Sequence, residues 1–322
     1  MKLTVPELVE QGTPDALLER INAFCTDENW EGIVDLRDRC TDAVERGKQL
    51  WAVAHHADYR LALEAPASWA APVIDSPAGR FTLGPLTEVA AERHTWAELE
   101  PYLGNGPSRS VLAYERAIRG DDDVTGEAIL EIPITPCPWE ATYTTPLFKP
   151  SRAETDPPVP AELDLITLPS AGEVIDDLDT TDALVALAST WTDQSNGTVE
   201  AVAVEGSAFS AIAALGLRQA RVASISGPDA LAIMAWTAAD GGAHGRRAGG
   251  AAGRFAAWWA AAALTDHLDD WPPSCDDLET AVSALRWWWW SDLFPATGWS
   301  CRLAVEDPAE GYAWVLNAAD AD

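Results

Sequence analysis

The C-terminal end of the chain holds three short stretches whose pattern decides the fold of the second half. Residues 286–290 read Arg-Trp-Trp-Trp-Trp, residues 299–305 read Trp-Ser-Cys-Arg-Leu-Ala-Val and residues 312–318 read Tyr-Ala-Trp-Val-Leu-Asn-Ala. Aromatic and β-branched residues favour strands. The intervening turn at 306–311, Glu-Asp-Pro-Ala-Glu-Gly, has residues typical of a hairpin loop. The three stretches therefore predict a three-stranded antiparallel β-meander.

The tryptophan run has two interpretations. On a strand, side chains alternate, so Trp287 and Trp289 would lie on one face and Trp288 and Trp290 on the other. We expect these rings to fill the core on both faces. The alternative is an aromatic wall for a flat or sugar-like ligand, or an anchor for a protein partner.

The residues before the meander alternate between helix and strand patterns. We expect strands at 198–204 and 219–225, and a set of helices at 181–192, 208–215, 228–238, 251–267 and 275–285. A strand, a short helix and a strand in so short a span allow a parallel pairing, but an antiparallel arrangement stays open. Residues 163–322 are therefore predicted to form an α+β domain.

The first part of the chain has the periodicity and end signals of helices. Residues 95–98, Thr-Trp-Ala-Glu, match the capping box of a helix start. Together these signals predict an all-helical domain over residues 1–125, arranged as a bundle or an irregular stack, with helices expected at 14–25, 27–46, 48–64, 85–93, 95–103 and 107–119.

Residues 126–162 separate the two patterns. Residues 129–134 alternate like an edge strand, and eight prolines between 133 and 160 then deny regular pairing. We expect an extended, proline-rich connection that runs over the surface. The predicted fold class is thus α+β: an all-helical N-terminal region, then a mixed α/β domain that ends in an antiparallel β-meander.

Charge and cysteine content narrow the classes of partner and compartment. The 51 acidic and 21 basic residues give a formal net charge of −30, which should repel nucleic acid and anionic lipid. The N-terminus lacks the pattern of a signal peptide, and no run of about 18 apolar residues predicts a membrane span. Five cysteines, odd in number and scattered, are expected to be reduced thiols in a cytoplasmic protein.

The best candidate binding site is a segment rich in glycine and arginine. Residues 241–254 read Gly-Gly-Ala-His-Gly-Arg-Arg-Ala-Gly-Gly-Ala-Ala-Gly-Arg, and no Asp or Glu occurs from 241 to 265. Glycines let backbone amides approach an anion, a helix N-terminus attracts negative charge, and guanidinium groups match phosphate or carboxylate oxygens. The candidate ligand-binding residues are His244, Arg246, Arg247 and Arg254. The alternative is a loop between two helices whose arginines pair with acidic residues elsewhere.

The sequence contains no familiar catalytic or cofactor motif. The glycine-arginine segment fits neither the phosphate-binding loop nor the dinucleotide fingerprint, and no Gly-x-Ser-x-Gly or His-Glu-x-x-His occurs. His55 and His56 are adjacent on an expected helix, so they point about 100° apart and cannot both face one metal. We expect no metal, no cofactor and no catalytic residue.

Three stretches carry a resemblance to a known group of proteins. Residues 85–99, 241–259 and 297–314 together resemble uncharacterised proteins from GC-rich actinobacteria. This resemblance implies a cytoplasmic bacterial protein and assigns no activity. The leading functional hypothesis is a non-catalytic binding or protein-interaction protein. The alternative is an enzyme or sensor that binds a small anionic ligand, bearing phosphate or carboxylate, at the glycine-arginine segment.

Overall fold

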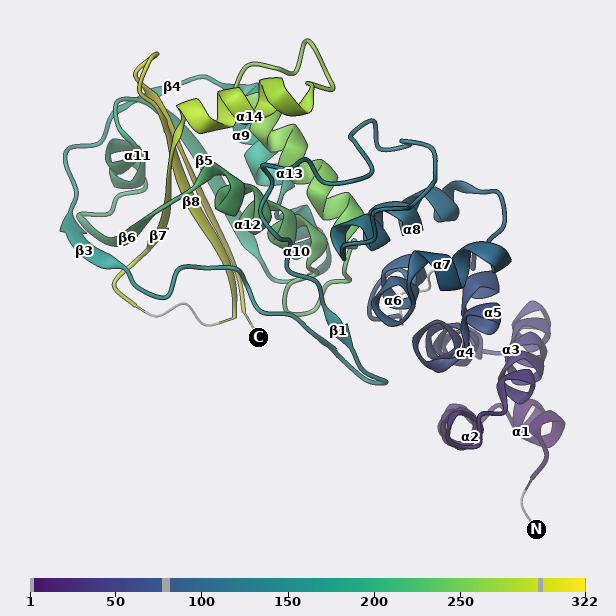
Figure 1. Ribbon diagram of the computed structural model, residues 1–322. Helices are drawn as coiled ribbons and strands as arrows, with labels where there is room; N and C mark the ends of the chain where they lie inside the picture. The colour runs from purple at the N-terminus through teal and green to yellow at the C-terminus, as the bar shows by residue number, and fades with distance from the viewer. Residues whose placement is uncertain (1–2, 77–81, 295–297, 322) are drawn as a thin grey trace. The chain divides into compact units, whose positions relative to one another are not determined.

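A computed structural model describes residues 3–76, 82–294 and 298–321 of the chain. The chain folds into two compact units (Figure 1). Unit 1 comprises residues 1–129 and 146–155, and unit 2 comprises residues 130–145 and 156–322. The proline-rich stretch, expected as a connection, is therefore divided between both units. Thr297, part of a stretch used for the resemblance, lies outside the described residues.

Unit 1 is helical, as its sequence predicts. Its helices are α1 (Val5–Gln11), α2 (Pro14–Thr26), α3 (Trp30–Glu45), α4 (Trp51–Glu64), α5 (Ala67–Ala70), η1 (Ala71–Val73), α6 (Leu86–Arg93), α7 (Trp96–Leu99), η2 (Glu100–Tyr102) and α8 (Pro107–Ile118). The later part of the chain adds a short antiparallel hairpin, β1 (Leu147–Phe148) and β2 (Ala153–Glu154), which the sequence did not predict.

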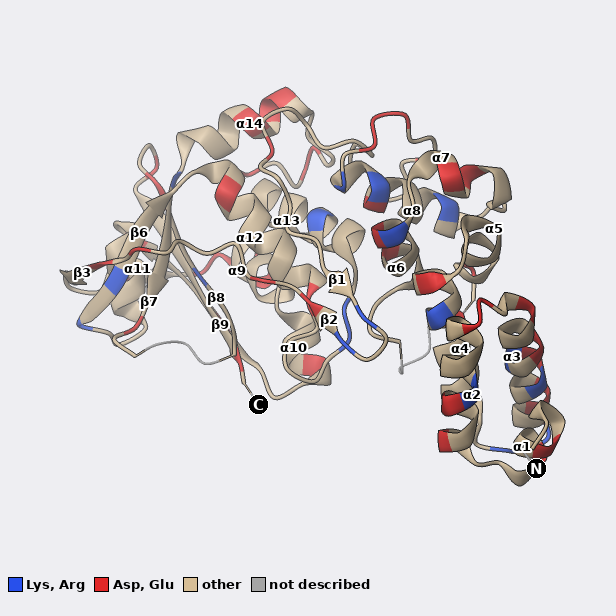
Figure 2. Ribbon diagram, turned by 60° about the horizontal axis from the view of Figure 1, so that its bottom comes forward, with Lys and Arg blue, Asp and Glu red and all other residues tan. Residues whose placement is uncertain are grey.

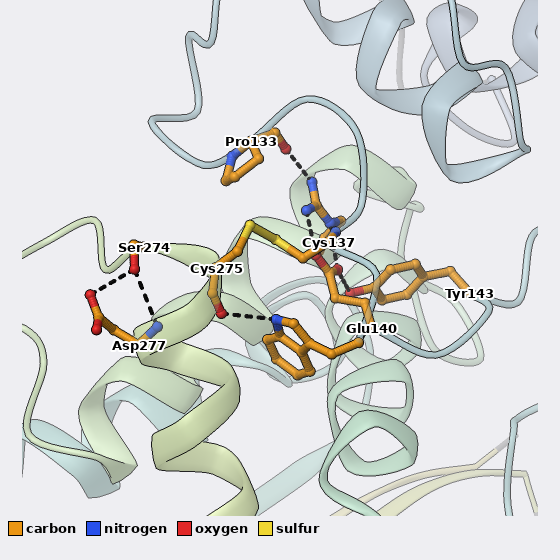
Figure 3. Close-up of a disulfide and its surroundings, with 9 residues drawn as sticks. Pro133, Cys137, Glu140, Tyr143, Ser274, Cys275 and Asp277 are labelled. Carbon is orange, nitrogen blue, oxygen red and sulfur yellow. Dashed lines mark hydrogen bonds and ion pairs between the residues drawn. A yellow bond between two sulfur atoms is a disulfide. The ribbon is translucent and has the colours of Figure 1, made fainter.

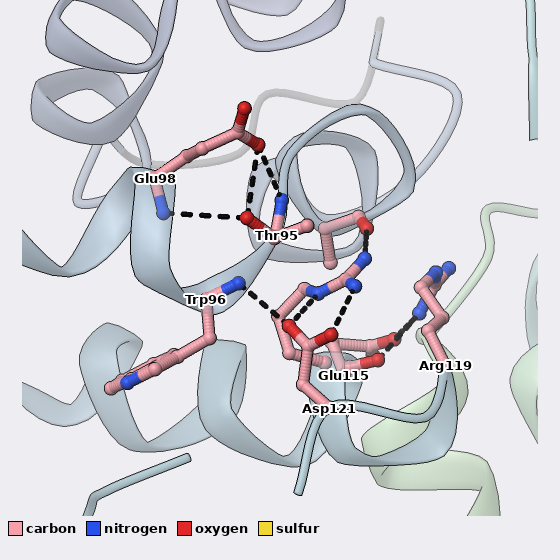
Figure 4. A network of polar contacts seen from close by, with 8 residues as sticks. Thr95, Trp96, Glu98, Glu115, Arg119 and Asp121 are labelled. Carbon is pink, nitrogen blue, oxygen red and sulfur yellow. Dashed lines mark hydrogen bonds and ion pairs between the residues drawn. The ribbon is translucent and has the colours of Figure 1, made fainter. Parts of the chain in front are cut away.

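The capping box predicted from the sequence is present at the start of α7 (Figure 4). The Thr95 hydroxyl accepts a hydrogen bond from the Glu98 amide, and the Glu98 carboxylate accepts one from the Thr95 amide at 2.9 Å. The adjacent amide of Trp96 donates to Asp121, whose carboxylate also pairs with Arg116 of α8 at 2.8 Å. The acidic turn after α8 thereby fixes the start of α7, which makes this polar network structural.

Unit 2 contains a seven-stranded sheet in which every neighbouring pair is antiparallel. The order is β3-β6-β7-β8-β9-β5-β4, so the meander β7-β8-β9 predicted from the sequence is confirmed. Three strands separate β5 from β6, which excludes the parallel pairing that the sequence allowed. The strands are β3 (Asp164–Thr167), β4 (Glu173–Ile175), β5 (Thr198–Glu205), β6 (Gln219–Ile225), β7 (Arg286–Ser291), β8 (Trp299–Asp307) and β9 (Tyr312–Asp320).

Helices cover both faces of this sheet (Figure 1). Helix α11 (Ala208–Ala214) packs on one face, against β5, β8 and β9. The other face carries α9 (Leu178–Ala186), α10 (Ser189–Gln194), α12 (Gly227–Ala239), α13 (Gly250–Leu264) and α14 (Cys275–Ala284). The fold is therefore α+β, as predicted.

The tryptophan run contributes to the core on both faces of the sheet. Trp290 is buried in the cluster beneath α11, and Trp288 packs on Phe209 of α11 with ring centroids 5.4 Å apart. Trp287 and Trp289 are also buried, and the Trp287 indole donates to the Val282 carbonyl of α14 at 3.0 Å. The core interpretation is thus confirmed, with Trp288 only half-buried.

Two expectations for the middle of the chain are wrong. Residues 129–134 form turns and bends instead of an edge strand. The Pro133 carbonyl accepts a hydrogen bond from Arg254, and the Glu131 carboxylate accepts one from the Trp271 indole. The cysteines are not all reduced: Cys137 and Cys275 form a disulfide across 138 residues of sequence, and Cys25, Cys40 and Cys301 are free.

In the described part of the chain, every helix is too short or too polar to cross a bilayer.

Candidate functional site

The glycine-arginine segment forms the loop between α12 and α13, and α13 begins at Gly250, close to the predicted start. Gly249 precedes it with a φ of 100°, which favours glycine. The amides of Ala248 and Gly249 both donate to the Ala239 carbonyl, at 2.9 and 3.4 Å. Two of the amides that an anion at this helix start would use are therefore already bonded.

Arg254, the last of the four predicted residues, is completely buried and serves the fold. Its Nη2 and Nε lie 2.6 and 2.8 Å from the two carboxylate oxygens of Glu140, whose side chain is also 0% exposed. Its Nη1 donates to the Pro133 carbonyl at 2.5 Å, and the Tyr143 hydroxyl donates to the same Glu140. A guanidinium with these bonds is not available to a ligand.

Like the ion pair of Glu140 with Arg254, the disulfide links residues 130–145 to the rest of unit 2 (Figure 3). Cys137, three residues before Glu140 in the chain, is bonded to Cys275 at the start of α14, with Cα atoms 6.0 Å apart. The Trp139 indole donates to the Cys275 carbonyl at 3.0 Å. Residues 130–145 are thus held to the rest of unit 2 by a covalent bond and a buried ion pair, and Ile132, Cys137 and Tyr143 of this segment are buried.

Arg247 is also engaged within the protein. Its Nη1 lies 2.5 Å from Asp240 Oδ2, and both side chains are 6% exposed. The Asp240 backbone carbonyl in turn accepts hydrogen bonds from Thr190 and from the Trp191 indole. The pair anchors the start of the loop to α10.

Arg246 and His244 have a different environment. Arg246 is half-buried, makes no ion pair with any described residue, and its Nε is buried without a hydrogen-bond partner among them. Burial lowers the pKa of its guanidinium. His244 is exposed, and its backbone amide donates to the Ser195 hydroxyl at 3.1 Å. The Arg246 amide donates to Gln194 Oε1 at 3.3 Å.

The structure therefore separates the four predicted residues into two sets. Arg247 and Arg254 stabilise the fold, whereas His244 and Arg246 keep side chains that no described carboxylate neutralises. The sequence reasoning missed Asp240, which lies one residue before the acid-free interval. It also missed Glu140, which is 114 residues away in sequence and gives no local signal.

A concave region elsewhere in unit 2 is acidic. A pocket of about 610 Å³ lies at the C-terminal end of α13 and is lined by the rings of Tyr312 and Trp314. Its described lining includes no basic residue, and its carboxylates are Asp177, Asp266, Asp307 and Glu310. An anion is repelled there, as it is by the acidic residues spread over both units (Figure 2).

One protein-family model matches most of the chain. The family of unknown function DUF6183 matches residues 15–322. The chain belongs to DUF6183. The prediction of an uncharacterised family is thus confirmed for all three stretches used for the resemblance, while the actinobacterial source stays a prediction. No curated protein and no solved structure matches the chain.

In this DUF6183 protein the histidine pair of α4 is part of the packing. The His56 ring stacks on Tyr59 with centroids 6.1 Å apart, and desolvation lowers the pKa of His56 to about 4. Among the described residues, His, Cys, Asp and Glu side chains form no group of three that could hold a metal ion.

Proposed function

We propose that this DUF6183 protein is a non-catalytic binding protein that holds a small anionic ligand at Arg246. The observation that carries the proposal is the unpaired, half-buried guanidinium of Arg246 in a chain of net charge −30. Arg218 and Arg221 also make no ion pair with a described residue, but both are exposed, whereas the Nε of Arg246 is buried. A desolvated charge without a partner costs free energy that a bound anion would recover.

The surroundings of Arg246 supply further donors. Gln194 and Ser195 each use an oxygen to accept a loop amide, which leaves the Gln194 amide group and the Ser195 hydroxyl hydrogen free to donate. The exposed imidazole of His244 adds a ring nitrogen that can donate a hydrogen bond. The set suits a phosphate or a carboxylate, since every one of these groups can donate a hydrogen bond.

The test is isothermal titration calorimetry of the full chain with inorganic phosphate and with citrate. We expect Arg246→Ala to weaken binding by about 10- to 150-fold, the equivalent of one charge-assisted hydrogen bond of about 1.5–3 kcal/mol. Arg218→Ala is the matched control, because Arg218 is an exposed arginine of the same unit. Equal affinities of the two variants, or no binding of either anion to the unmodified chain, would overturn the proposal.

A protein partner is the second candidate function, favoured by one aromatic cluster. Phe255 and Trp259 of α13 lie with Trp271, with ring centroids 4.9 to 6.5 Å apart, and Trp259 is 36% exposed. Exposed tryptophans are enriched at protein interfaces. Paired pull-downs with Trp259→Ala and with Trp69→Ala, an equally exposed tryptophan of unit 1, test this. A partner lost only with Trp259→Ala supports the interface, and equal recovery with both refutes it.

The cytoplasmic location belongs to the same proposal. The net charge argues against nucleic acid and anionic membranes as partners. The argument from reduced cysteines no longer supports the location, because disulfides persist mainly in oxidising compartments. Cell fractionation of the source organism tests it directly.

A further inference from the structure

The acidic pocket of unit 2, with a volume of about 610 Å³, lies between the sheet and helices that cover one of its faces. Its lining comes from the start of α9, the last turns of α13 and α14, and the hairpin that joins β8 to β9. Pockets for small molecules typically measure about 300–1,000 Å³. None of the lining residues belongs to the loop that carries Arg246.

The strand register places the pocket residues of β8 and β9 on one face of the sheet. Asp307 of β8 is directly opposite Tyr312 of β9, and Trp314 follows two residues later. Residues opposite each other, and residues two apart on one strand, have side chains on the same face. Ala313, between the two rings, belongs to the core beneath α11 on the other face. The Trp314 indole donates to Asp177 at the N-cap of α9 at 2.7 Å, so the rings and the Asp307 carboxylate share the side that α9 covers.

The carboxylates around the pocket have no cationic partner. Those in its lining are Asp177, Asp266, Asp307 and Glu310. None of them forms an ion pair with a described residue. Asp307 Oδ1 accepts the backbone amides of Ala309 and Glu310 at 2.8 and 3.2 Å, and its Oδ2 has no hydrogen-bond partner in the described part of the chain. Glu205 of β5 lies opposite Tyr312 on its other side, so this ring stands between two carboxylates.

Two helix ends add negative potential from the backbone. The last turns of α13 and α14 both line the pocket, and these helices are 15 and 10 residues long. The carbonyls of a last turn give a helix C-terminus about half a negative charge. Helix α9 instead begins at the pocket, but the Asp177 carboxylate accepts the Thr180 amide there and offsets the positive end. Side-chain and backbone charges therefore both favour a cation.

The uncharged part of the lining determines which kind of cation fits. The walls from α13 and α14 carry the side chains of Ala263, Leu264, Ala281, Ala284 and Leu285. Methylene groups of a ligand would gain free energy by burial against them. The ring of Tyr312 is 36% exposed and offers its face to a cationic nitrogen. Among the described residues, no group of three His, Cys, Asp or Glu side chains is placed to hold a metal ion, so an organic cation is preferred.

We propose that the acidic pocket binds a linear polyamine, in which cationic amino groups alternate with methylene chains. One ammonium group would lie on the ring of Tyr312 and donate to Asp307 Oδ2. The methylene chain would pack on the alanine and leucine side chains, and a second ammonium group would extend toward Asp266 at the end of α13. This site is separate from the anion site at Arg246, and neither proposal depends on the other.

The experiment is isothermal titration calorimetry of the full chain with spermidine in about 150 mM salt, which screens attraction beyond roughly 8 Å. We expect one spermidine molecule to bind per chain. Tyr312→Leu keeps an apolar side chain and should weaken binding by about 2- to 30-fold, the range of one cation–π contact. Asp307→Asn keeps the acceptor for the amides of Ala309 and Glu310 and should weaken binding by about fivefold, because it removes one charge.

Three controls separate this site from general attraction to an acidic protein. Asp164→Asn makes the same change at an exposed position of β3, three strands away from β9, and should leave the affinity unchanged. Hexaamminecobalt(III) carries the charge of spermidine without methylene groups and should bind more weakly. Arg246→Ala should leave spermidine binding unchanged, whereas Tyr312→Leu should leave phosphate binding unchanged.

Several results would overturn the inference. They are no binding of spermidine, binding of several molecules per chain with equal affinity, or full affinity in Tyr312→Leu or Asp307→Asn. An equal loss in Asp164→Asn and Asp307→Asn, or equally tight binding of hexaamminecobalt(III), would also do so, because either shows attraction by net charge alone. Loss of phosphate binding in Arg246→Ala with spermidine binding retained bears only on the anion site.

Discussion

The buried ion pair between Arg254 and Glu140 yields the sharpest prediction about this DUF6183 protein. Replacing Arg254 with Met keeps an unbranched stem at this position but removes the guanidinium. Glu140 would then be a fully buried carboxylate that has lost two hydrogen bonds, at 2.6 and 2.8 Å. The Pro133 carbonyl loses its donor as well.

The expected cost follows from the burial of both partners. Removal of one partner of a buried ion pair destabilises a protein by about 3–5 kcal/mol, because the other charge stays uncompensated. For a unit of this size, that corresponds to a fall of about 6–20 °C in the melting temperature. The double variant Arg254→Met, Glu140→Leu removes both charges and should recover most of this loss, because apolar side chains can replace a buried pair at little cost.

Urea unfolding followed by circular dichroism, together with calorimetric melting, measures these differences. Arg286→Ala is the control: its ion pair with Glu306 is solvent-accessible, with Arg286 61% exposed, so its loss should cost less than about 1 kcal/mol. The reasoning is refuted if Arg254→Met is no more destabilising than Arg286→Ala. It is also refuted if the double variant is as unstable as the sum of its single variants.

Three further predictions concern other parts of the chain. A thiol reagent added to the unfolded chain should find three free thiols without reductant and five after reduction; five before reduction would contradict the disulfide. Because the pKa of His56 falls to about 4 on folding from its ordinary 6.5, the unfolded chain takes up a proton first. The stability that His56 contributes above pH 6.5 is then lost as the pH falls toward 4, and His56→Gln should flatten the pH dependence of the unfolding free energy between about pH 7 and pH 5. Gly242→Ala should destabilise more than Gly12→Ala, which should cost about 1–2 kcal/mol for its left-handed backbone alone. Both glycines have positive φ, 69° and 66°, but only at Gly242 would a Cβ collide with the carboxylate of Asp320; equal losses in urea unfolding would argue against this contact.

Local patterns allowed much of the fold to be predicted from the sequence. The aromatic and β-branched residues of three stretches, with the turn at 306–311 between two of them, identified the meander, and the Thr95 capping box marked a helix start correctly. The strands β3 and β4 were missed because four and three residues are too few to show a period. The order of the seven strands depends on contacts between distant segments, which no local pattern encodes.

The candidate site was predictable only in part, for a similar reason. The loop and the start of α13 were found from glycine and arginine content. Whether an arginine is free depends on carboxylates that fold back onto it, and Glu140 does so from a stretch that reads as a surface connection. The pairing of Cys137 with Cys275 is equally remote. Composition therefore identified the basic segment but could not tell which charges were already neutralised.

The assignment of residues 130–145 to unit 2 and of residues 146–155 to unit 1 has a consequence for dissecting the protein. A single cut anywhere in the chain leaves at least one unit without a segment that it needs. A continuous fragment that holds all of unit 1 must also carry residues 130–145, and one that holds all of unit 2 must also carry residues 146–155. The match of DUF6183 to residues 15–322 fits this interleaving, since the unit of inheritance must then span both halves.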